Sequence, residues 1–405
     1  MPSALPDGQP VPPGGDLPPG TLRSLGSRGF GVYVHVPFCA SRCGYCDFNT
    51  YTATELGGGG AQESYADAVL GEVALGARVL DGAAPPVGTV FFGGGTPTLL
   101  PAGDLSRILE GVDRAFGLAA GAEVTTEANP ESVDPAALRR LRAAGFTRVS
   151  LGMQSAAPHV LAVLDRRHTP GRAAVAVAEA RAAGFDHVNL DLIYGTPGES
   201  ADDFAESLRR AIATGADHVS AYSLIVEDGT RLAAQVRRGE IPAPDDDVAA
   251  DRYLAADAIL SEAGFGWYEV SNWATSADAR CRHNLLYWRG GDWWGFGPGA
   301  HSHVGGVRWW NEKHPVTYAR RLAEGVTPAR AREILDAEER RVEDVMLRLR
   351  LAEVLPLRTL TPDAVGAARD AVSGGLLSAE EYARGQAVLT TRGRLLADAV
   401  VRSLV

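Results

Sequence analysis

Short apolar runs alternate with amphipathic stretches between residues 30 and 225. The stretches between the runs have apolar residues at helical spacing, as in Leu105, Ile108, Leu109, Val112 and Phe116. The β-rich runs lie at 32–36, 89–92, 122–127, 148–151, 187–193 and 218–224. Strands that alternate with helices predict parallel βαβ units. Because six units are too few for a closed eight-stranded barrel, the pattern predicts an α/β fold with an open, partial (β/α)6 TIM-like barrel.

The pattern changes on both sides of this region and divides the chain into four predicted parts. Residues 1–28 are rich in Pro and Gly and predict a disordered tail. Residues 29–225 form the barrel, and residues 226–327 form an aromatic-rich segment with a helix expected from Asp247 to Ala263. Residues 328–405 have a charged helical pattern and a strand-turn-strand near 387–396, which predicts a small winged-helix-like α+β domain. Without a basic recognition helix, we expect this domain to pack or dock a partner rather than bind DNA.

Composition narrows the classes of function. The 405 residues carry a net charge of −11, which argues against a general binder of nucleic acid or anionic membranes. Four cysteines, three of them in one motif, fit a reducing cytosol better than a disulfide framework. The chain has neither an apolar run of membrane-spanning length nor a signal-peptide core. We therefore expect a soluble, cytoplasmic protein without a transmembrane segment.

Cys39, Cys43 and Cys46 follow the first apolar run in a C-x3-C-x2-C pattern. Structural zinc and electron-transfer clusters usually take four protein ligands, so three thiolates leave one metal position open for chemistry. Two alternatives are a Cys3His zinc site that includes His35, and reduced core cysteines. Against zinc, His35 lies on the predicted strand, four residues before Cys39, which is not zinc-finger spacing.

Glycine-rich or polar sequence also ends the next four runs, where ligands collect in parallel barrels. The second run ends in Gly93-Gly94-Gly95-Thr96-Pro97, whose glycines would let the backbone approach a ligand, unless they form only a tight turn. The third, fourth and fifth runs lead to Glu127, Gln154 and Asp191. Each has a structural alternative: a cap on the next turn for Glu127, a loop hydrogen bond for Gln154, and a barrel-top network for Asp191.

The cysteine motif resembles that of the radical S-adenosylmethionine (SAM) superfamily, and Tyr33-x-His35 and Tyr45 match it too. The strings YVHVPFC, GGGTP, TTEANP, LGMQS, NLDLIYGTPGE and YSLIVEDGT resemble the oxygen-independent coproporphyrinogen III oxidase family over roughly residues 30 to 230. The resemblance implies that the three cysteines hold a 4Fe-4S cluster whose fourth iron is chelated by SAM. It also implies one-electron reduction of SAM to a 5′-deoxyadenosyl radical.

The same resemblance implies a set of SAM contacts. The matched positions are Tyr33, Gly94, Gly95, Thr96, Glu127, Gln154, Arg166 and Asp191. Gln154, Arg166 and Asp191 match residues that contact SAM or a second SAM. Arg166 could instead be a solvated helix charge, Arg167 is an alternative choice for its role, and His168 is left without one. No residue is assigned to catalysis.

Two features favour the HemW branch of this family, whose members are regarded as haem chaperones. Oxidases carry a further cysteine two residues after the last cluster cysteine, where this chain has Phe48. The segment 282–288 also matches the H-N-x-x-Y-W motif of that branch. A histidine beside aromatic rings suits haem, because imidazole can ligate iron and flat apolar surfaces stack on the macrocycle. His283 is therefore predicted to bind haem, and the alternative is an interdomain core histidine.

Other residues near this motif have open roles. Cys281 could be a further iron ligand, but an ordinary buried thiol is favoured. The turn-rich segment 295–302 predicts a loop over the barrel mouth, from which His301 and His303 could face a porphyrin.

The favoured hypothesis is a haem chaperone with a SAM-ligated 4Fe-4S cluster, which transfers haem to an acceptor protein. The alternative is an enzyme, a radical SAM oxidoreductase of the coproporphyrinogen III dehydrogenase type, which converts two propionates to vinyl groups; Phe48 disfavours it. A third hypothesis, methylation, would need an acceptor site that we do not find in the sequence. The expected partners are haem, its acceptor protein and an electron donor for the cluster, and a homodimer is compatible with the sequence.

Overall fold

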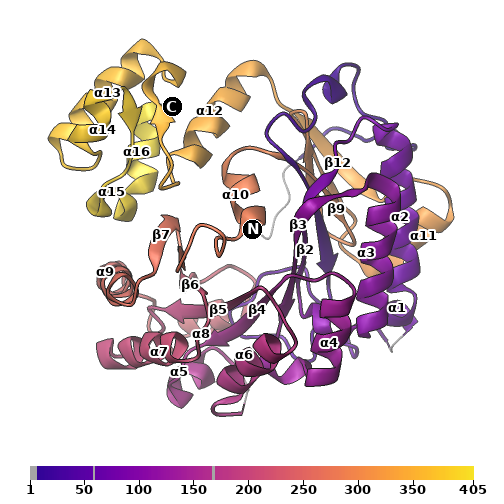
Figure 1. Ribbon diagram of the computed structural model, residues 1–405, viewed down its shortest axis with the longest axis horizontal. Helices are drawn as coiled ribbons and strands as arrows, with labels where there is room; N and C mark the ends of the chain where they lie inside the picture. The colour runs from indigo at the N-terminus through magenta and orange to yellow at the C-terminus, as the bar shows by residue number, and fades with distance from the viewer. Residues whose placement is uncertain (1–6, 58–59, 167–168) are drawn as a thin grey trace.

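The computed structural model describes residues 7–57, 60–166 and 169–405, and a mixed sheet of twelve strands runs through this part of the chain (Figure 1). At its centre six neighbouring strands are parallel. They are β1 (Phe30–Val36), β2 (Val87–Gly94), β3 (Leu118–Ala128), β4 (Arg148–Gln154), β5 (His187–Tyr194) and β6 (His218–Ser223). All six predicted runs are therefore strands, and the predicted partial barrel is confirmed.

Helices follow these strands and cover the outer face of the sheet (Figure 1). They are α1 (Gly60–Glu63), α2 (Tyr65–Leu80), α3 (Ala102–Phe116), α4 (Pro135–Ala143), α5 (Pro158–Val163), α6 (Arg172–Ala182), α7 (Ala201–Ala213), α8 (Arg231–Arg237) and α9 (Asp246–Glu262). The apolar stripe predicted for α3 is the face that it buries against the sheet. Helix α7 begins with a capping box in which Ser200 and Asp203 satisfy each other's backbone N–H groups.

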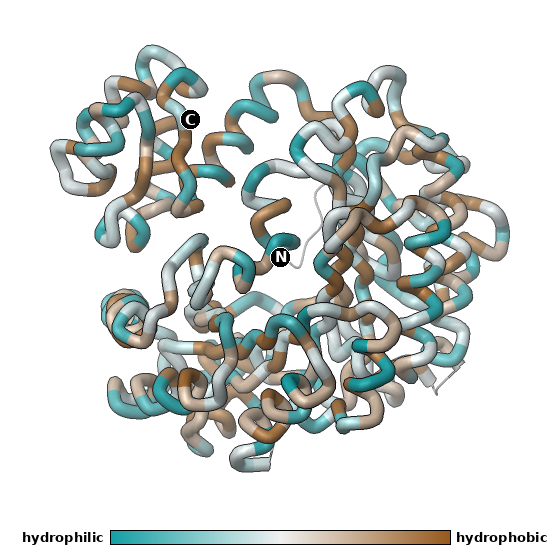
Figure 2. The backbone as a smooth tube through the Cα atoms, in the orientation of Figure 1, coloured by the Kyte–Doolittle hydropathy of each residue, from teal (hydrophilic) through white to brown (hydrophobic). Residues whose placement is uncertain are grey.

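The core lies between the strands and these helices. Val32, Val34, Val90 and Phe92 are fully buried, and such side chains contribute about 1.5–3 kcal/mol each when removed from water. Figure 2 shows apolar positions along the strands and polar positions on the outer turns of the helices. The described helices include none with the length and apolarity needed to cross a membrane.

The aromatic-rich segment extends the sheet at both ends, which the sequence pattern did not predict. Strands β8 (Asn272–Ala274) and β7 (Gly266–Glu269) follow β6, and β9 (Asp292–Phe296) pairs in parallel with β1. Strands β10 (His301–Val304), β11 (Val307–Asn311) and β12 (Ala329–Ile334) then continue the sheet in antiparallel fashion. Helices α10 (Arg282–Trp288) and α11 (Pro315–Ala323) connect these strands. The helix expected at 247–263 is present as α9.

The prediction of a disordered tail is wrong for residues 7–28, which pack on the barrel. Gln9 and Arg332 exchange two backbone hydrogen bonds of 2.7 and 2.9 Å, so the segment covers the outer edge of β12. Val11, Leu17, Leu22 and Leu25 pack against the main core. The prolines fix an extended backbone, and the few apolar side chains between them are enough to hold it in place. Residues 1–6 lie outside the described residues.

The C-terminal unit begins later than the predicted boundary at 328, because β12 belongs to the large sheet. A second hydrophobic core starts at Val345 on α12 (Ala337–Arg348). This core also includes residues of β13 (Leu355–Pro356), α13 (Pro362–Ser373), α14 (Ala379–Ala383), β14 (Gln386–Ala387) and α16 (Ala397–Leu404). Between β14 and α16 lies α15 (Thr391–Leu395), whose Leu395 packs against the main core. The two-stranded sheet and its helices agree with the predicted α+β character. Arg394 joins this unit to the barrel through two hydrogen bonds to Asp257, of 3.0 and 2.6 Å.

Candidate functional site

The cysteine loop closes on itself at the carboxyl end of β1. Cys39 N donates to Tyr51 O (3.0 Å) and Tyr51 N donates to Pro37 O (2.6 Å), so the two ends of the loop are paired. Cys39, Cys43 and Cys46 are free and half-buried between these ends. Burial, with the neighbouring Cys46 and Cys43 thiols, raises the pKa of Cys39 to about 11. The loop thus brings three neighbouring thiols, none of them in a disulfide, to one edge of the barrel.

The glycines after β2 are required by this loop. Gly95 N donates to Val36 O (2.8 Å) and Thr96 N donates to Phe38 O (2.7 Å), so the glycine segment runs directly beside the cysteine loop. A Cβ atom on Gly95 would lie 2.5 Å from Phe38 O. Gly94 has φ +110°, and a Cβ atom there would lie 2.6 Å from the His35 ring. Close packing of backbone on backbone therefore explains these glycines before any ligand is considered.

Asn49, which the sequence analysis did not single out, fixes the far side of the loop. Its Nδ2 donates to Pro298 O (3.0 Å) and to Lys313 O (2.9 Å), and its carbonyl oxygen lies 2.9 Å from His35 Nε2. Pro298 lies in the turn between β9 and β10. The segment 295–302, predicted as one loop over the barrel mouth, is therefore two strand ends and a turn that holds the cysteine loop.

Two carboxyl groups, Glu127 and Asp191, are buried close to each other, and Arg166 is a cation that acts on Asp191. Glu127 at the end of β3 accepts from Gly94 N (3.1 Å), and burial together with the nearby Asp191 raises its pKa to about 8. Asp191 on β5 accepts from Ser150 Oγ and Asn189 Nδ2, both at 2.8 Å, and burial raises its pKa. Desolvated carboxyl groups of this kind favour the arrival of a cation, which would restore their charged forms.

Arg166 joins the cysteine loop to the end of β4. Its Nη1 donates to Cys43 Sγ (3.4 Å) and its Nη2 to Gly152 O (3.2 Å), while Nε is buried without a partner among the described residues. The buried Gln154 has φ +64°, a left-handed conformation that is uncommon outside glycine. Arg167 and His168 lie outside the described residues. Arg166 therefore contacts the cysteine loop and is not a solvated helix charge.

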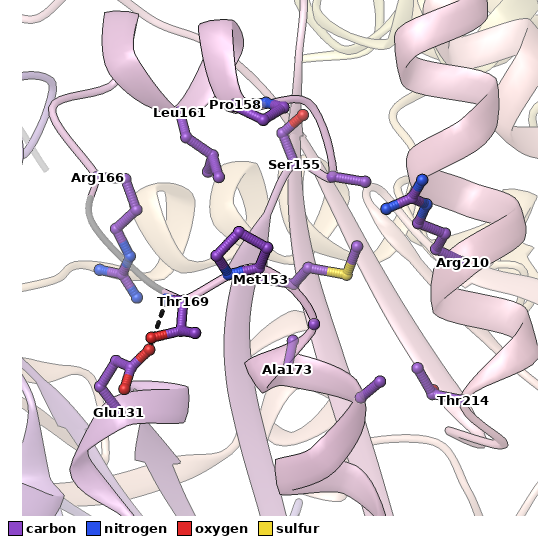
Figure 3. A pocket seen from close by; sticks show the side chains of 14 residues that line it. Glu131, Met153, Ser155, Pro158, Leu161, Arg166, Thr169, Ala173, Arg210 and Thr214 are labelled. Atoms are coloured by element: carbon purple, nitrogen blue, oxygen red, sulfur yellow. Dashed lines mark hydrogen bonds between the residues drawn. The ribbon is translucent and has the colours of Figure 1, made fainter.

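Arg166 also lines a cavity of about 580 Å³ on the helix side of β4 (Figure 3). Met153 lies at its centre, with Ala173 of α6 below it and Arg210 of α7 on the side opposite Arg166 (Figure 3). Glu131, at the Arg166 end, accepts from Thr169 N (2.6 Å). The cavity is mainly apolar and is distinct from the thiols of the cysteine loop.

The H-N-x-x-Y-W segment forms α10, which packs against β1 and β2. His283 is only 1% exposed. Its Nδ1 lies 2.8 Å from Thr89 Oγ1 and its Nε2 lies 2.8 Å from the Tyr287 hydroxyl, so both ring nitrogens are engaged. Burial lowers the pKa of His283 to about 3, which keeps the ring neutral. His283 thus lies in the structure as a core histidine with both ring nitrogens bonded, which was the alternative to haem binding. It offers no free imidazole nitrogen.

Tyr33 on β1 lies between the two motifs. Its hydroxyl is 3.0 Å from His35 Nδ1, and its ring stacks on Phe91 (6.3 Å between centroids) and on His283 (6.5 Å). Burial, Cys281 and Glu127 raise the pKa of Tyr287, so the phenol of α10 is within electrostatic reach of the carboxyl at the end of β3. The cysteine loop and α10 therefore border the same part of the barrel.

A buried ion pair holds α10 in position, and sequence reasoning missed it. Arg148 Nε donates to Glu123 Oε2 at 3.1 Å, and both side chains are almost completely buried. Glu123 Oε1 accepts from His283 N (3.0 Å), and Arg148 Nη2 donates to the carbonyl oxygens of Ala279 and Arg280. The sequence feature that could have indicated this pair is a charged residue in each of two strands, Glu123 in β3 and Arg148 in β4.

The other candidates near α10 lie as follows. Cys281 is buried, and burial raises the pKa of its thiol, as expected for an ordinary core cysteine. His303 on β10 bonds through Nδ1 to Gly291 O (3.1 Å) and its ring lies 5.3 Å from that of Trp293. His301 stacks on Trp310 at 6.0 Å.

The donor set fits a cluster better than a single metal ion. Among the described residues, no three His, Cys, Asp or Glu side chains converge on a single-ion site. Three thiolates that each bind a different iron of a cluster do not need to converge on one point. His35 has both ring nitrogens engaged, with Tyr33 and Asn49, which counts against the Cys3His zinc alternative.

Comparison with known proteins first defines the class. The model of the radical SAM superfamily matches residues 33–211. The solved structure of coproporphyrinogen III oxidase (HemN) from Escherichia coli, a radical SAM enzyme, superposes with a TM-score of 0.80 over 95% of this chain and 91% of that one. At 24% identity this likeness concerns the fold. Fold and cysteine loop are those of a radical SAM protein, a class that implies a 4Fe-4S cluster and SAM.

Sequence relatives then define the family. The chain is 56% identical over 384 residues to heme chaperone HemW of Mycobacterium tuberculosis (strain H37Rv), a match that covers 95% of this chain and 97% of the relative. It is 34% identical over 330 residues to heme chaperone HemW of Escherichia coli (strain K12), covering 80% and 83%. The chain belongs to the HemW family.

Proposed function

We propose that this protein is a haem chaperone, which holds SAM on a 4Fe-4S cluster, binds haem and passes it to an acceptor protein. The observation that carries the proposal is 56% identity, over nearly the whole chain, to a protein named as a heme chaperone. The helix α10, with the H-N-x-x-Y-W motif, supports it because this helix packs on the barrel strand that leads to the cysteine loop. An electron donor for the cluster is a further partner, and four free cysteines fit a reducing cytoplasm.

In this proposal Cys39, Cys43 and Cys46 would hold the 4Fe-4S cluster, to which SAM would bind. The bound cluster and SAM supply one-electron chemistry, while the protein orients them and excludes water. Gly95 and Thr96 hold the cysteine loop by the backbone bonds described above, and Gly94 N donates to Glu127.

The carboxyl groups and Arg166 receive SAM by charge. Glu127 and Asp191 lie where a cation is favoured, so we assign them to the amino and sulfonium charges of SAM. The guanidinium of Arg166, with its unsatisfied Nε, suits the carboxylate of SAM. Tyr33 and Gln154 complete the set of proposed contacts.

The oxidase alternative is not favoured. Phe48 is 53% exposed on the cysteine loop at the position where oxidases carry a further cysteine. A benzyl side chain can neither transfer a proton nor ligate iron, so this position lacks the chemistry that the oxidases retain there.

The test combines two assays on one anaerobically reconstituted preparation: a haem titration, and incubation with coproporphyrinogen III, SAM and dithionite. We expect saturable haem binding and no decarboxylated product. Conversion of propionates to vinyl groups would establish the oxidase instead, and absence of haem binding would overturn the chaperone.

A further inference from the structure

Thr50 lies at the closed end of the cysteine loop. Cys39 N donates at 3.0 Å to the carbonyl oxygen of Tyr51, the residue after Thr50, and Tyr51 N donates to Pro37 O at 2.6 Å. The carbonyl oxygen of Thr50 itself accepts from Arg42 Nη2. These bonds bring Thr50 beside the first cysteine of the motif and fix its backbone, so the fold of the loop sets the position of its side chain.

The hydroxyl of Thr50 is buried and unsatisfied. The residue is only 2% exposed, and its Oγ1 atom has no hydrogen-bond partner among the described residues. Burial of a hydroxyl without a partner costs stability, and most buried side-chain polar atoms in proteins are paired. A threonine in this position therefore holds a donor ready for an acceptor that arrives later.

The groups on which this hydroxyl acts are two of the three thiols. Burial raises the pKa of Cys39, and the hydroxyls of Thr96 and Thr50 act in the opposite direction. Burial also raises the pKa of Cys46, where the backbone N–H of Phe48 and the hydroxyl of Thr50 oppose it. A hydroxyl lowers the pKa of a thiol by donating toward the thiolate. The Thr50 hydroxyl therefore lies beside both the first and the last thiol of the motif.

We infer that the Thr50 hydroxyl donates a hydrogen bond to the cysteine thiolates that hold the cluster, and thereby makes the cluster easier to reduce. This inference rests on the proposed function, and it names a residue that tunes the cofactor of that site. Reduction adds negative charge to a cluster, so a hydrogen bond to its sulfur ligands stabilises the reduced form more than the oxidised form. The electron comes from the external donor. Thr50 transfers neither an electron nor a proton and is a positioning residue that acts through Cys39 and Cys46.

The experiment is a redox titration of the anaerobically reconstituted full-length protein, in which electron paramagnetic resonance reports the reduced cluster. Thr50→Val keeps the shape of the side chain but loses the hydroxyl. At the midpoint potential of the wild type, the ratio of reduced to oxidised cluster in this variant should be about tenfold lower, equivalent to a midpoint about 59 mV more negative for one electron. Thr50→Ser retains a hydroxyl and should keep the midpoint of the wild type.

Thr125→Val is the matched control. Thr125 on β3 is also a fully buried threonine whose hydroxyl has no partner among the described residues, but it lies within the sheet and outside the cysteine loop. Its replacement should leave the midpoint unchanged. Iron and sulfide analysis of each variant shows whether the cluster has assembled, and Thr50→Ala provides a second variant without the hydroxyl, which should share the lower midpoint.

The outcomes separate this inference from the proposed function. A wild-type midpoint in the hydroxyl-free variants, or a midpoint in Thr50→Ser as low as theirs, would overturn the inference while the haem chaperone stands. Loss of the cluster from both hydroxyl-free variants would also overturn it, because Thr50 would then be needed for assembly of the cluster instead of for its potential. A wild type that assembles no cluster would overturn the proposed function itself.

Discussion

The cysteine loop and α10 are equally conspicuous as sequence motifs, yet the fold leaves them in opposite states. In the loop three half-buried thiols form no disulfide, and the nearby Glu127 and Asp191 are desolvated carboxyl groups with raised pKa values. In α10 the histidine has both nitrogens bonded. The first region is a site that a ligand completes, whereas the second is largely complete already.

The difference shows that a motif identifies a region before it identifies the reactive atom. Unsatisfied polar groups cost stability when buried, so a protein keeps them where a ligand will pair with them. A satisfied group such as the His283 imidazole contributes to structure instead.

Removal of the three thiols should have the largest effect. Cys39, Cys43 and Cys46 all changed to Ala should abolish reconstituted iron and sulfide, because no other thiol lies in the loop. Chemical analysis of iron and sulfide checks this. Cys281→Ala is the matched control and should retain a full cluster; equal loss in this control would mean that the buried thiol is a ligand.

Breaking the buried Glu123–Arg148 ion pair should have the second largest effect, on the stability of the fold. Glu123→Gln leaves Arg148 buried without a countercharge, so we expect the free energy of unfolding to fall by about 3–5 kcal/mol. Urea denaturation measures it. Glu206→Gln removes an exposed partner of Arg210 and should cost less than about 1 kcal/mol. If the two variants lost similar free energies of unfolding, the Glu123–Arg148 pair would not have the structural role that we assign to it.

Neutralising Glu127 should weaken SAM binding without destabilising the fold. Glu127→Gln keeps the shape of the side chain but loses the charge, so SAM affinity should fall by about tenfold to a hundredfold, equivalent to about 1.5–3 kcal/mol. Isothermal titration of the reconstituted protein measures it. Haem affinity in the same variant serves as the control and should not change. Wild-type SAM affinity in this variant would remove Glu127 from the site.

The pH dependence of SAM binding should be the smallest effect. Because the pKa of Glu127 is about 8 before SAM binds, the carboxyl must lose a proton to pair with a cation. Affinity should therefore rise with pH between about 6 and 7.5, by at most about tenfold for each pH unit. Glu127→Gln should flatten this dependence. A slope of the opposite sign would mean that the protonated carboxyl binds SAM.

Much of the fold could be predicted because the spacing of apolar residues along the chain indicates its strands and helices. The six parallel strands follow from apolar runs that helical segments separate, and the cysteine loop from spacing alone. Strands β9 to β12 were missed because their tryptophans suggested a ligand surface, while in fact Trp294 and Trp309 fill the core. The engagement of His283 by Thr89 could not be predicted, since the two residues meet only through the packing of α10 on β2.

The central claim is that the chain holds two separable sites, one completed by a cluster with SAM and one built for haem. The most direct test is a matched titration of SAM and of haem on the wild type, the triple cysteine variant and His283→Ala. The cysteine variant should lose SAM and keep haem, whereas His283→Ala should keep SAM and lose most of its haem affinity. Loss of both ligands together in each variant would contradict it.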